Sequence, residues 1–118
     1  MKVEAAPEVR IEINTGSRPD VTVLKISGPL TIRNFFEFQD AARGNQSPVL
    51  IIDFAEVPFM DSAALGCVLG LHVSCERNKR KYALVNVNAR LQTMFTVCGV
   101  QDVVVTFSTL AEAEAALA

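Results

Sequence analysis

A buried strand, a polar corner and an apolar helix follow one another between residues 49 and 73. The run 49–54 (VLIIDF) has the near-continuous hydrophobicity of a strand that is buried on both faces. Residues 63–73 are too apolar for a helix on the surface. Between the two, Asp61 is a strong candidate for the helix N-cap, and Ser62 follows it beside backbone N–H groups that have no partner within the helix. Because a helix N-terminus attracts anions, the corner suits a hydroxyl whose phosphorylation a partner could recognise.

The composition restricts the class of protein. With 118 residues, half of them apolar and a fifth charged, the chain is expected to form one globular domain over residues 1–118. A net charge of −2 gives no electrostatic reason to bind nucleic acid or an anionic membrane. No signal-like apolar segment and no run of about 18 apolar residues occurs, so we expect a cytoplasmic protein with no membrane partner.

Metal and cofactor chemistry has little support in the sequence. The chain has one histidine, and none of its three cysteines (Cys67, Cys75 and Cys98) forms a C-x-x-C pair. We therefore expect no metal site, no cofactor, and cysteines that act as small buried hydrophobic residues. No phosphate-binding glycine motif of a nucleotide enzyme is present.

Alternation of strands and helices predicts the fold class. Residues 15–20 have turn composition between two candidate strands, which predicts an antiparallel hairpin, and from residue 36 onward helices and strands alternate. The expected fold is α/β, a mixed four- to five-stranded sheet with helices mainly on one face. The expected strands are 9–14, 21–26, 49–54, 82–85 and 103–105.

Four helices are expected between or after these strands. Thr31 is expected to cap the first, with Ile32, Phe35 and Phe36 near one side and residues 44–45 as its stop. Gly66 and Gly70 would let the helix that begins at Asp61 lie close to the strands. Asn88 and Gly99 bound the next helix, and Thr109 with Glu112 has the spacing of a capping box before the last.

The corner also resembles a known motif. Residues 60–66 (MDSAALG) are similar to the phosphorylation loop of the STAS family, the anti-sigma factor antagonists, which typically reads Met-Asp-Ser-Ser-Gly-Leu-Gly. Residues 88–99 resemble the next helix of that family. The serine that accepts phosphate in the family aligns with Ala63, and an aspartate that supports phosphorylation there aligns with Thr31. Ser62 is therefore the remaining candidate for phosphorylation at the corner.

The resemblance implies a non-enzymatic protein that binds an anti-sigma factor or related serine kinase, with Thr31, Asp61, Ser62 and Ala63 as partner-binding residues. A catalytic pair of Ser62 and His72 is disfavoured, because ten residues along one helix span about 15 Å. Two alternatives stay open: a phosphorylation-independent scaffold or accessory subunit of a signalling or transport complex, and a module that senses a small anion or nucleotide. A homodimer or larger assembly is also left open.

Overall fold

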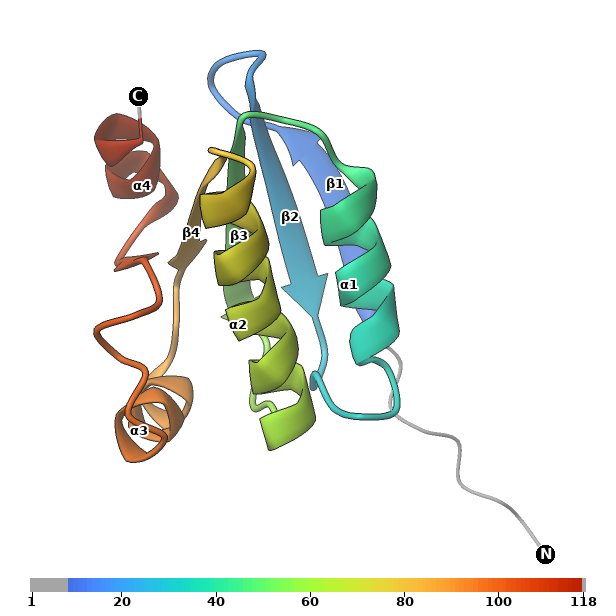
Figure 1. The fold of residues 1–118 in the computed structure, drawn as a ribbon. Coiled ribbons are helices and arrows are strands. Elements are labelled where there is room, and N and C mark those ends of the chain that lie inside the picture. The colour runs from blue at the N-terminus through green and yellow to red at the C-terminus, as the bar shows by residue number, and fades with distance from the viewer. Residues whose placement is uncertain (1–8, 118) are drawn as a thin grey trace, which may run out of the picture.

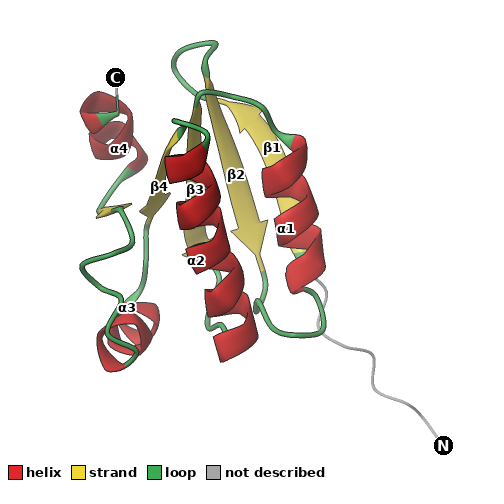
Figure 2. Ribbon diagram, in the orientation of Figure 1, coloured by secondary structure: helices red, strands yellow, loops and turns green. Residues whose placement is uncertain are grey.

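The structure, a computed structural model, describes residues 9–117 and contains a five-stranded sheet with four helices (Figure 1, Figure 2). Strands and helices alternate after the first two strands, as expected. The elements are β1 (Arg10–Thr15), β2 (Val21–Ser27), α1 (Phe35–Gly44), β3 (Val49–Glu56), α2 (Ser62–Arg77), β4 (Lys81–Val85), α3 (Ala89–Val97), β5 (Thr106–Phe107) and α4 (Leu110–Ala116).

The sheet is mixed, which confirms the predicted fold class. Its strand order is β1-β2-β3-β4-β5, and β1 pairs with β2 as an antiparallel hairpin while every other pair is parallel. The parallel strands require crossover connections, which α1, α2 and α3 supply. Consequently the carboxyl ends of β2 and β3 lie at the same edge of the sheet, where the chain turns towards α1 and α2 (Figure 1).

Two hydrophobic clusters cover the two faces of the sheet. The larger one packs α1, α2 and α3 on one face through residues such as Phe38, Val68 and Leu91. The smaller one joins the other face of β2, β3 and β4 to α4 through Ala113. Strands 49–54 and 82–85 are thus buried on both faces, as their apolar runs predicted. By contrast β1 is mostly exposed rather than half-buried, because it is an edge strand.

The strand expected at 103–105 is wrong. The strand that pairs with β4 is Thr106–Phe107, in the register Leu84 with Thr106 and Val85 with Phe107. The preceding valines lie in a turn, in which the amides of Val103 and Val104 both donate to the carbonyl of Val100. Val104 is buried in the larger core, so its hydrophobicity serves packing rather than strand pairing.

The expected start of the first helix is also wrong. The helix begins at Phe35 with Asn34 at its N-cap position, and Thr31 lies in the preceding turn. Its buried face carries Phe38 and Ala42, whereas Ile32 and Phe36 are 64% and 60% exposed. The sequence pattern is compatible with a helix that begins after Thr31 and with one that begins after Asn34. In the structure, the side chain of Asn34 bonds to the backbone of Thr31 and Pro29, and the helix begins after Asn34.

Helix α2 uses only one side to cover the sheet. Its buried residues include Ala64, Val68 and Leu71. Gly66 and Gly70 are exposed instead, and a Cβ atom at either position would meet no other atom within 4 Å, so the expected close approach to the strands is wrong. The expectation for the cysteines holds for Cys75, which is buried, but not for Cys98, which is exposed at the end of α3.

The last helix is anchored to the first hairpin. Glu114 is only 8% exposed, and its carboxylate accepts hydrogen bonds from the backbone amide of Ser17 at 3.2 Å and from the Ser17 hydroxyl. The guanidinium of Arg18 donates to the backbone carbonyl of Glu114. The two donors of Ser17 satisfy a buried carboxylate, which would otherwise be costly. Thr109 caps this helix by accepting from the amide of Glu112, as predicted.

Candidate partner-binding site

Asp61 connects two chain segments at the start of α2. Its Oδ1 accepts a hydrogen bond from the amide of Ala64 at 3.0 Å, which is the predicted N-cap. Its Oδ2 accepts from the amide of Ile32 at 2.8 Å, in the loop between β2 and α1. One carboxylate therefore caps α2 and holds the neighbouring loop against that helix.

The loop between β2 and α1 runs beside the end of β3 for several residues. The amide of Leu30 donates to the carbonyl of Phe59 at 3.1 Å, and the amide of Asp61 donates back to Leu30 at 3.2 Å. At its start, Gly28 has φ +104° and donates to Glu56 at 2.9 Å. The positive φ favours glycine, so this residue lets the loop leave β2 while staying paired.

Asn34 shapes the turn around Thr31 and was missed in the sequence. Its Oδ1 accepts from the amide of Thr31 at 2.8 Å, and its Nδ2 donates to the carbonyl of Pro29 at 2.8 Å. The side chain is 6% exposed, so these bonds are shielded from water. An asparagine in a loop with Gly28 and Pro29 is a typical turn signal and could have indicated this role.

Ser62 and Ala63 occupy different environments in the first turn of α2. Ser62 is exposed, and its hydroxyl forms no hydrogen bond with any residue in the described range 9–117. Ala63 is half-buried and faces the groove between α1 and α2. The structure thus brings Thr31, Asp61, Ser62 and Ala63 to one corner, with Ser62 as its accessible hydroxyl.

A third element meets the corner from the side of α3. The side chain of Asn88 caps α3 through the amide of Leu91 at 2.9 Å, and its Nδ2 donates to the carbonyl of Val57 at 2.9 Å. The guanidinium carbon of Arg90 lies 5.0 Å from the centre of the Phe59 ring, a cation–π distance. Asn88 therefore fixes the start of α3 to the segment that leads into Asp61.

Exposed apolar side chains accompany the polar corner. Ile32, whose amide binds Asp61, is 64% exposed, and Phe36 is 60% exposed with its ring stacked on Phe35 at 4.2 Å between centroids. Exposed large apolar groups next to a polar surface are typical of protein contact sites. The sequence pattern placed both residues near one side of a helix and gave no sign that they would be exposed.

The described residues offer no cluster of metal ligands at the corner. Within residues 9–117, no group of three or more His, Cys, Asp or Glu side chains is placed to hold a metal ion. His72 lies farther along α2, where its Nδ1 is 2.7 Å from the Tyr82 hydroxyl and its Nε2 is 3.2 Å from Glu76. Over the same residues, no helix is long and apolar enough to cross a membrane.

A family model for the STAS domain matches residues 12–113, which is most of the chain. The chain belongs to the STAS family. The matched range includes the corner of Asp61 and Ser62.

Known proteins resemble this STAS domain in sequence and in fold. The anti-sigma-B factor antagonist of Listeria monocytogenes is 34% identical over 56 residues, which are 48% of this chain and 49% of that protein. An anti-sigma factor antagonist from Mycobacterium paratuberculosis has a TM-score of 0.80 at 17% identity, covering 93% of this chain and 94% of its own. A Thermotoga maritima protein described as a candidate anti-sigma factor antagonist has a TM-score of 0.81 at 19% identity, covering 91% and 93%. The structural likeness at these identities concerns the fold.

Proposed function

We propose that this STAS domain is a non-enzymatic anti-sigma factor antagonist that binds an anti-sigma factor or a related serine kinase. The binding surface is the corner formed by Thr31, Ile32, Asp61, Ser62 and Ala63, called the corner surface below. The observation that carries the proposal is the double role of Asp61, which caps α2 and holds the exposed loop of Ile32 beside it. The similarity to the Listeria antagonist supports the class of partner.

The corner surface combines features that a protein partner can recognise. The start of α2 presents backbone N–H groups and the positive end of the helix dipole, next to the exposed hydroxyl of Ser62. Ile32 and Phe36 add apolar area beside it. A polar centre flanked by apolar side chains supplies both orientation and buried area for a partner.

Regulation by phosphate is proposed to differ from that of relatives with a serine at the second loop position. Ala63 stands at that position and has no hydroxyl, and Thr31 replaces the aspartate that accompanies it. Ser62 is one residue earlier, so its side chain is rotated by about 100° around the helix. We therefore infer that phosphorylation at position 63 does not control partner binding in this protein, because Ala63 cannot be phosphorylated.

A pull-down with a matched pair of glutamate variants tests the proposal. Ala63→Glu places a charge where a docked partner would exclude water, so the variant should bind the partner poorly. The fold should tolerate the change, because an acidic residue is favourable in the first turn of a helix. Ala111→Glu is the control, because Ala111 is exposed and is also the second residue of its helix, α4, after the Thr109 cap. We expect Ala63→Glu to lose the anti-sigma factor or kinase from a native lysate and Ala111→Glu to retain it.

Two outcomes would contradict the proposal. Retention of the partner by Ala63→Glu at the wild-type level would place the interface elsewhere. Equal loss by both variants would show that the interface is not specific to the corner surface. Melting curves of both variants establish that each remains folded.

A further inference from the structure

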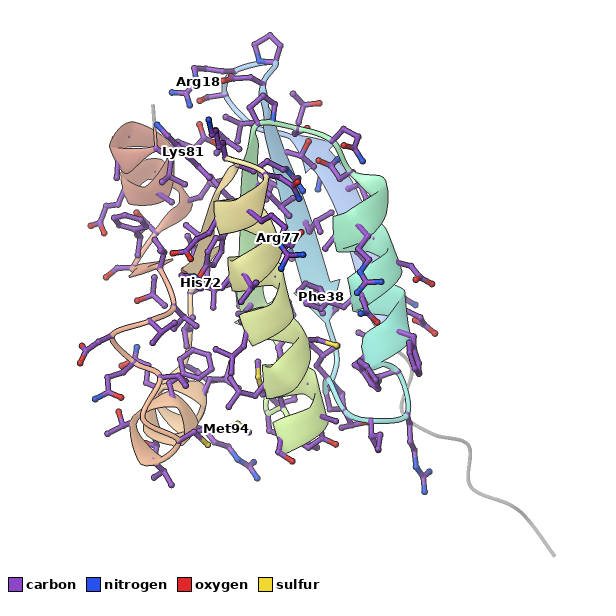
Figure 3. The ribbon with its side chains drawn as sticks, in the orientation of Figure 1. Arg18, Phe38, His72, Arg77, Lys81 and Met94 are labelled. Atoms are coloured by element: carbon purple, nitrogen blue, oxygen red, sulfur yellow. The ribbon has the colours of Figure 1, made fainter. Side chains whose placement is uncertain are left out.

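A groove of about 830 Å³ lies between α1 and α2 and extends from Ala63, in the first turn of α2, to Arg77 and Arg80 at the other end of that helix. Its volume is within the range of pockets that hold small organic ligands, roughly 300–1,000 Å³. Figure 3 shows Phe38 and Arg77 at the gap between the two helices. Both helices run in the same direction, so their C-terminal ends lie together at one end of the groove (Figure 1).

Two glycines keep the α2 side of the groove open. Gly66 and Gly70 line it one helical turn apart, and a Cβ atom at either position would meet nothing within 4 Å. Glycine inside a helix is less favourable than alanine. Neither glycine is required by a close neighbour or by a positive φ in this helix. Their effect on the structure is to leave space beside Phe35, Ala42 and Leu71, which also line the groove.

The groove has a cationic end. Arg43, Arg77 and Arg80 all line it, and none of the aspartates and glutamates among residues 9–117 does. Burial raises the pKa of the Cys67 thiol on the groove wall, and the nearby charge of Arg43 opposes that shift. The two helix C-termini contribute about half a negative charge each, which three full positive charges outweigh. The end of the groove therefore favours an anion.

Arg80 is held in place, and one of its donor atoms has no partner among the described residues. Its Nε donates to the carbonyl of Ser47 at 2.9 Å, which orients the guanidinium. Its Nη2 is buried, and no acceptor within the described residues 9–117 is in hydrogen-bonding range. A buried unpaired donor is unfavourable, and a guanidinium fork matches the geometry of carboxylate and phosphate oxygens.

We propose that the groove between α1 and α2 binds a small amphipathic anion. Its carboxylate or phosphate group binds at the end formed by Arg43, Arg77 and Arg80. Its apolar part lies along the space that Gly66 and Gly70 leave open. The groove shares Ala63 with the corner surface, but the three arginines lie at its opposite end, and the inference does not rest on the proposed function.

Calorimetric titration with four probes tests the chemistry of the site. Octyl phosphate and octanoate carry an anionic head and an apolar tail, octanol has the tail without the charge, and inorganic phosphate has the charge without the tail. We expect at least one of the two anionic amphiphiles to bind at least tenfold more tightly than octanol and inorganic phosphate. Comparison of octyl phosphate with octanoate identifies the preferred head group.

Two pairs of variants locate the binding. The double variant Arg43→Gln with Arg77→Gln is expected to weaken binding about tenfold or more, because charge-assisted hydrogen bonds are lost. Its control, Lys79→Gln with Lys81→Gln, makes the same change in net charge near the end of α2 at residues that do not line the groove. Gly70→Leu is expected to fill the groove and abolish binding. Its control is Thr93→Leu, which adds a leucine at an exposed position of α3 that does not line the groove.

The proposal fails if the anionic amphiphiles bind no better than octanol, or if none of the probes binds up to millimolar concentration. It also fails if Gly70→Leu binds like the wild type, or if the lysine double variant loses as much affinity as the arginine one. Partner capture by Gly70→Leu is measured in the same pull-down as Ala63→Glu. Because the ligand assay needs no partner and the pull-down needs no ligand, failure of one proposal is distinguished from failure of the other.

Discussion

The carboxylate of Asp61 and the backbone amide of Ile32 are hydrogen-bonded at 2.8 Å, although they are 29 positions apart in the chain. The other oxygen of that carboxylate caps α2. Loss of the side chain therefore removes two charge-assisted hydrogen bonds at once, from two different segments.

Asp61→Ala is expected to lower the free energy of unfolding by about 2 kcal/mol, since a cap alone contributes about 1 kcal/mol and the second bond adds to it. Thr109→Ala is the control, because Thr109 caps α4 with a single hydrogen bond and should cost about 1 kcal/mol. Urea unfolding measures both. Equal losses in the two variants would show that the bond to Ile32 adds nothing.

The wild-type STAS domain is expected to be a poor substrate for the serine kinases that phosphorylate its relatives, because Ala63 has no hydroxyl. Ala63→Ser should create a phosphorylation site, and adding Thr31→Asp should increase its modification. The phosphate would bring about −1.5 to −2 charges to the N-terminus of α2, which the helix dipole accommodates. Intact-mass analysis after incubation with kinase and ATP measures the gain. One phosphate on the wild type, mapped to the exposed Ser62, would contradict this prediction.

Two glycine-to-alanine substitutions are expected to change stability in opposite directions. Gly70→Ala should stabilise by about 0.5–1 kcal/mol, because the new Cβ meets nothing and helix propensity improves. Gly16→Ala should destabilise by about 1–3 kcal/mol, because its Cβ would lie 2.6 Å from Cγ1 of the buried Val21. Thermal melts measure both. A stabilising Gly16→Ala would show that the hairpin loop shifts freely.

Tyr82 is expected to ionise above its ordinary pKa of about 10, because burial raises the pKa of its phenol more than the hydrogen bond from the Val105 amide lowers it. The neutral phenol is thus favoured in the folded state. Its contribution to stability is complete below pH 10 and is lost as the pH rises through the folded-state pKa. Tyr82 is the only tyrosine and tryptophan is absent, so ultraviolet absorbance follows it directly. Tyr82→Phe should flatten the alkaline loss of stability, and an ordinary midpoint in the wild type would contradict the assignment.

Local patterns were sufficient to predict much of the architecture and the cap at Asp61. Continuous apolar runs identified the two buried strands, and side chains with capping chemistry identified the starts of α2, α3 and α4. Such signals act within a few residues of one another. The run 103–105 shows their limit, because a cluster of valines is equally compatible with a strand and with a turn that buries one of them.

The rest of the candidate site depends on contacts between segments distant in sequence. The bond from Ile32 to Asp61 and the one from Asn88 to Val57 join residues about 30 positions apart, and no spacing rule predicts them. The exposure of Phe36 depends on the residue at which α1 begins. Asn34 sets that start, because its side chain holds the turn at Thr31 that precedes the helix. Likewise, the glycines of α2 could be assigned to a groove only once α1 was placed beside them.

The attachment of Glu114 to Ser17 also has a consequence for the timing of folding. These residues are separated by 97 positions, and Ala113, next to Glu114, completes the cluster on the second face of the sheet. During synthesis that face therefore remains uncovered until almost the whole domain has left the ribosome. Contacts of such long sequence separation slow folding and prolong the exposure of apolar strands. The nascent chain should accordingly depend on chaperone protection more than its short length suggests, and a chain that ends before α4 should aggregate rather than fold.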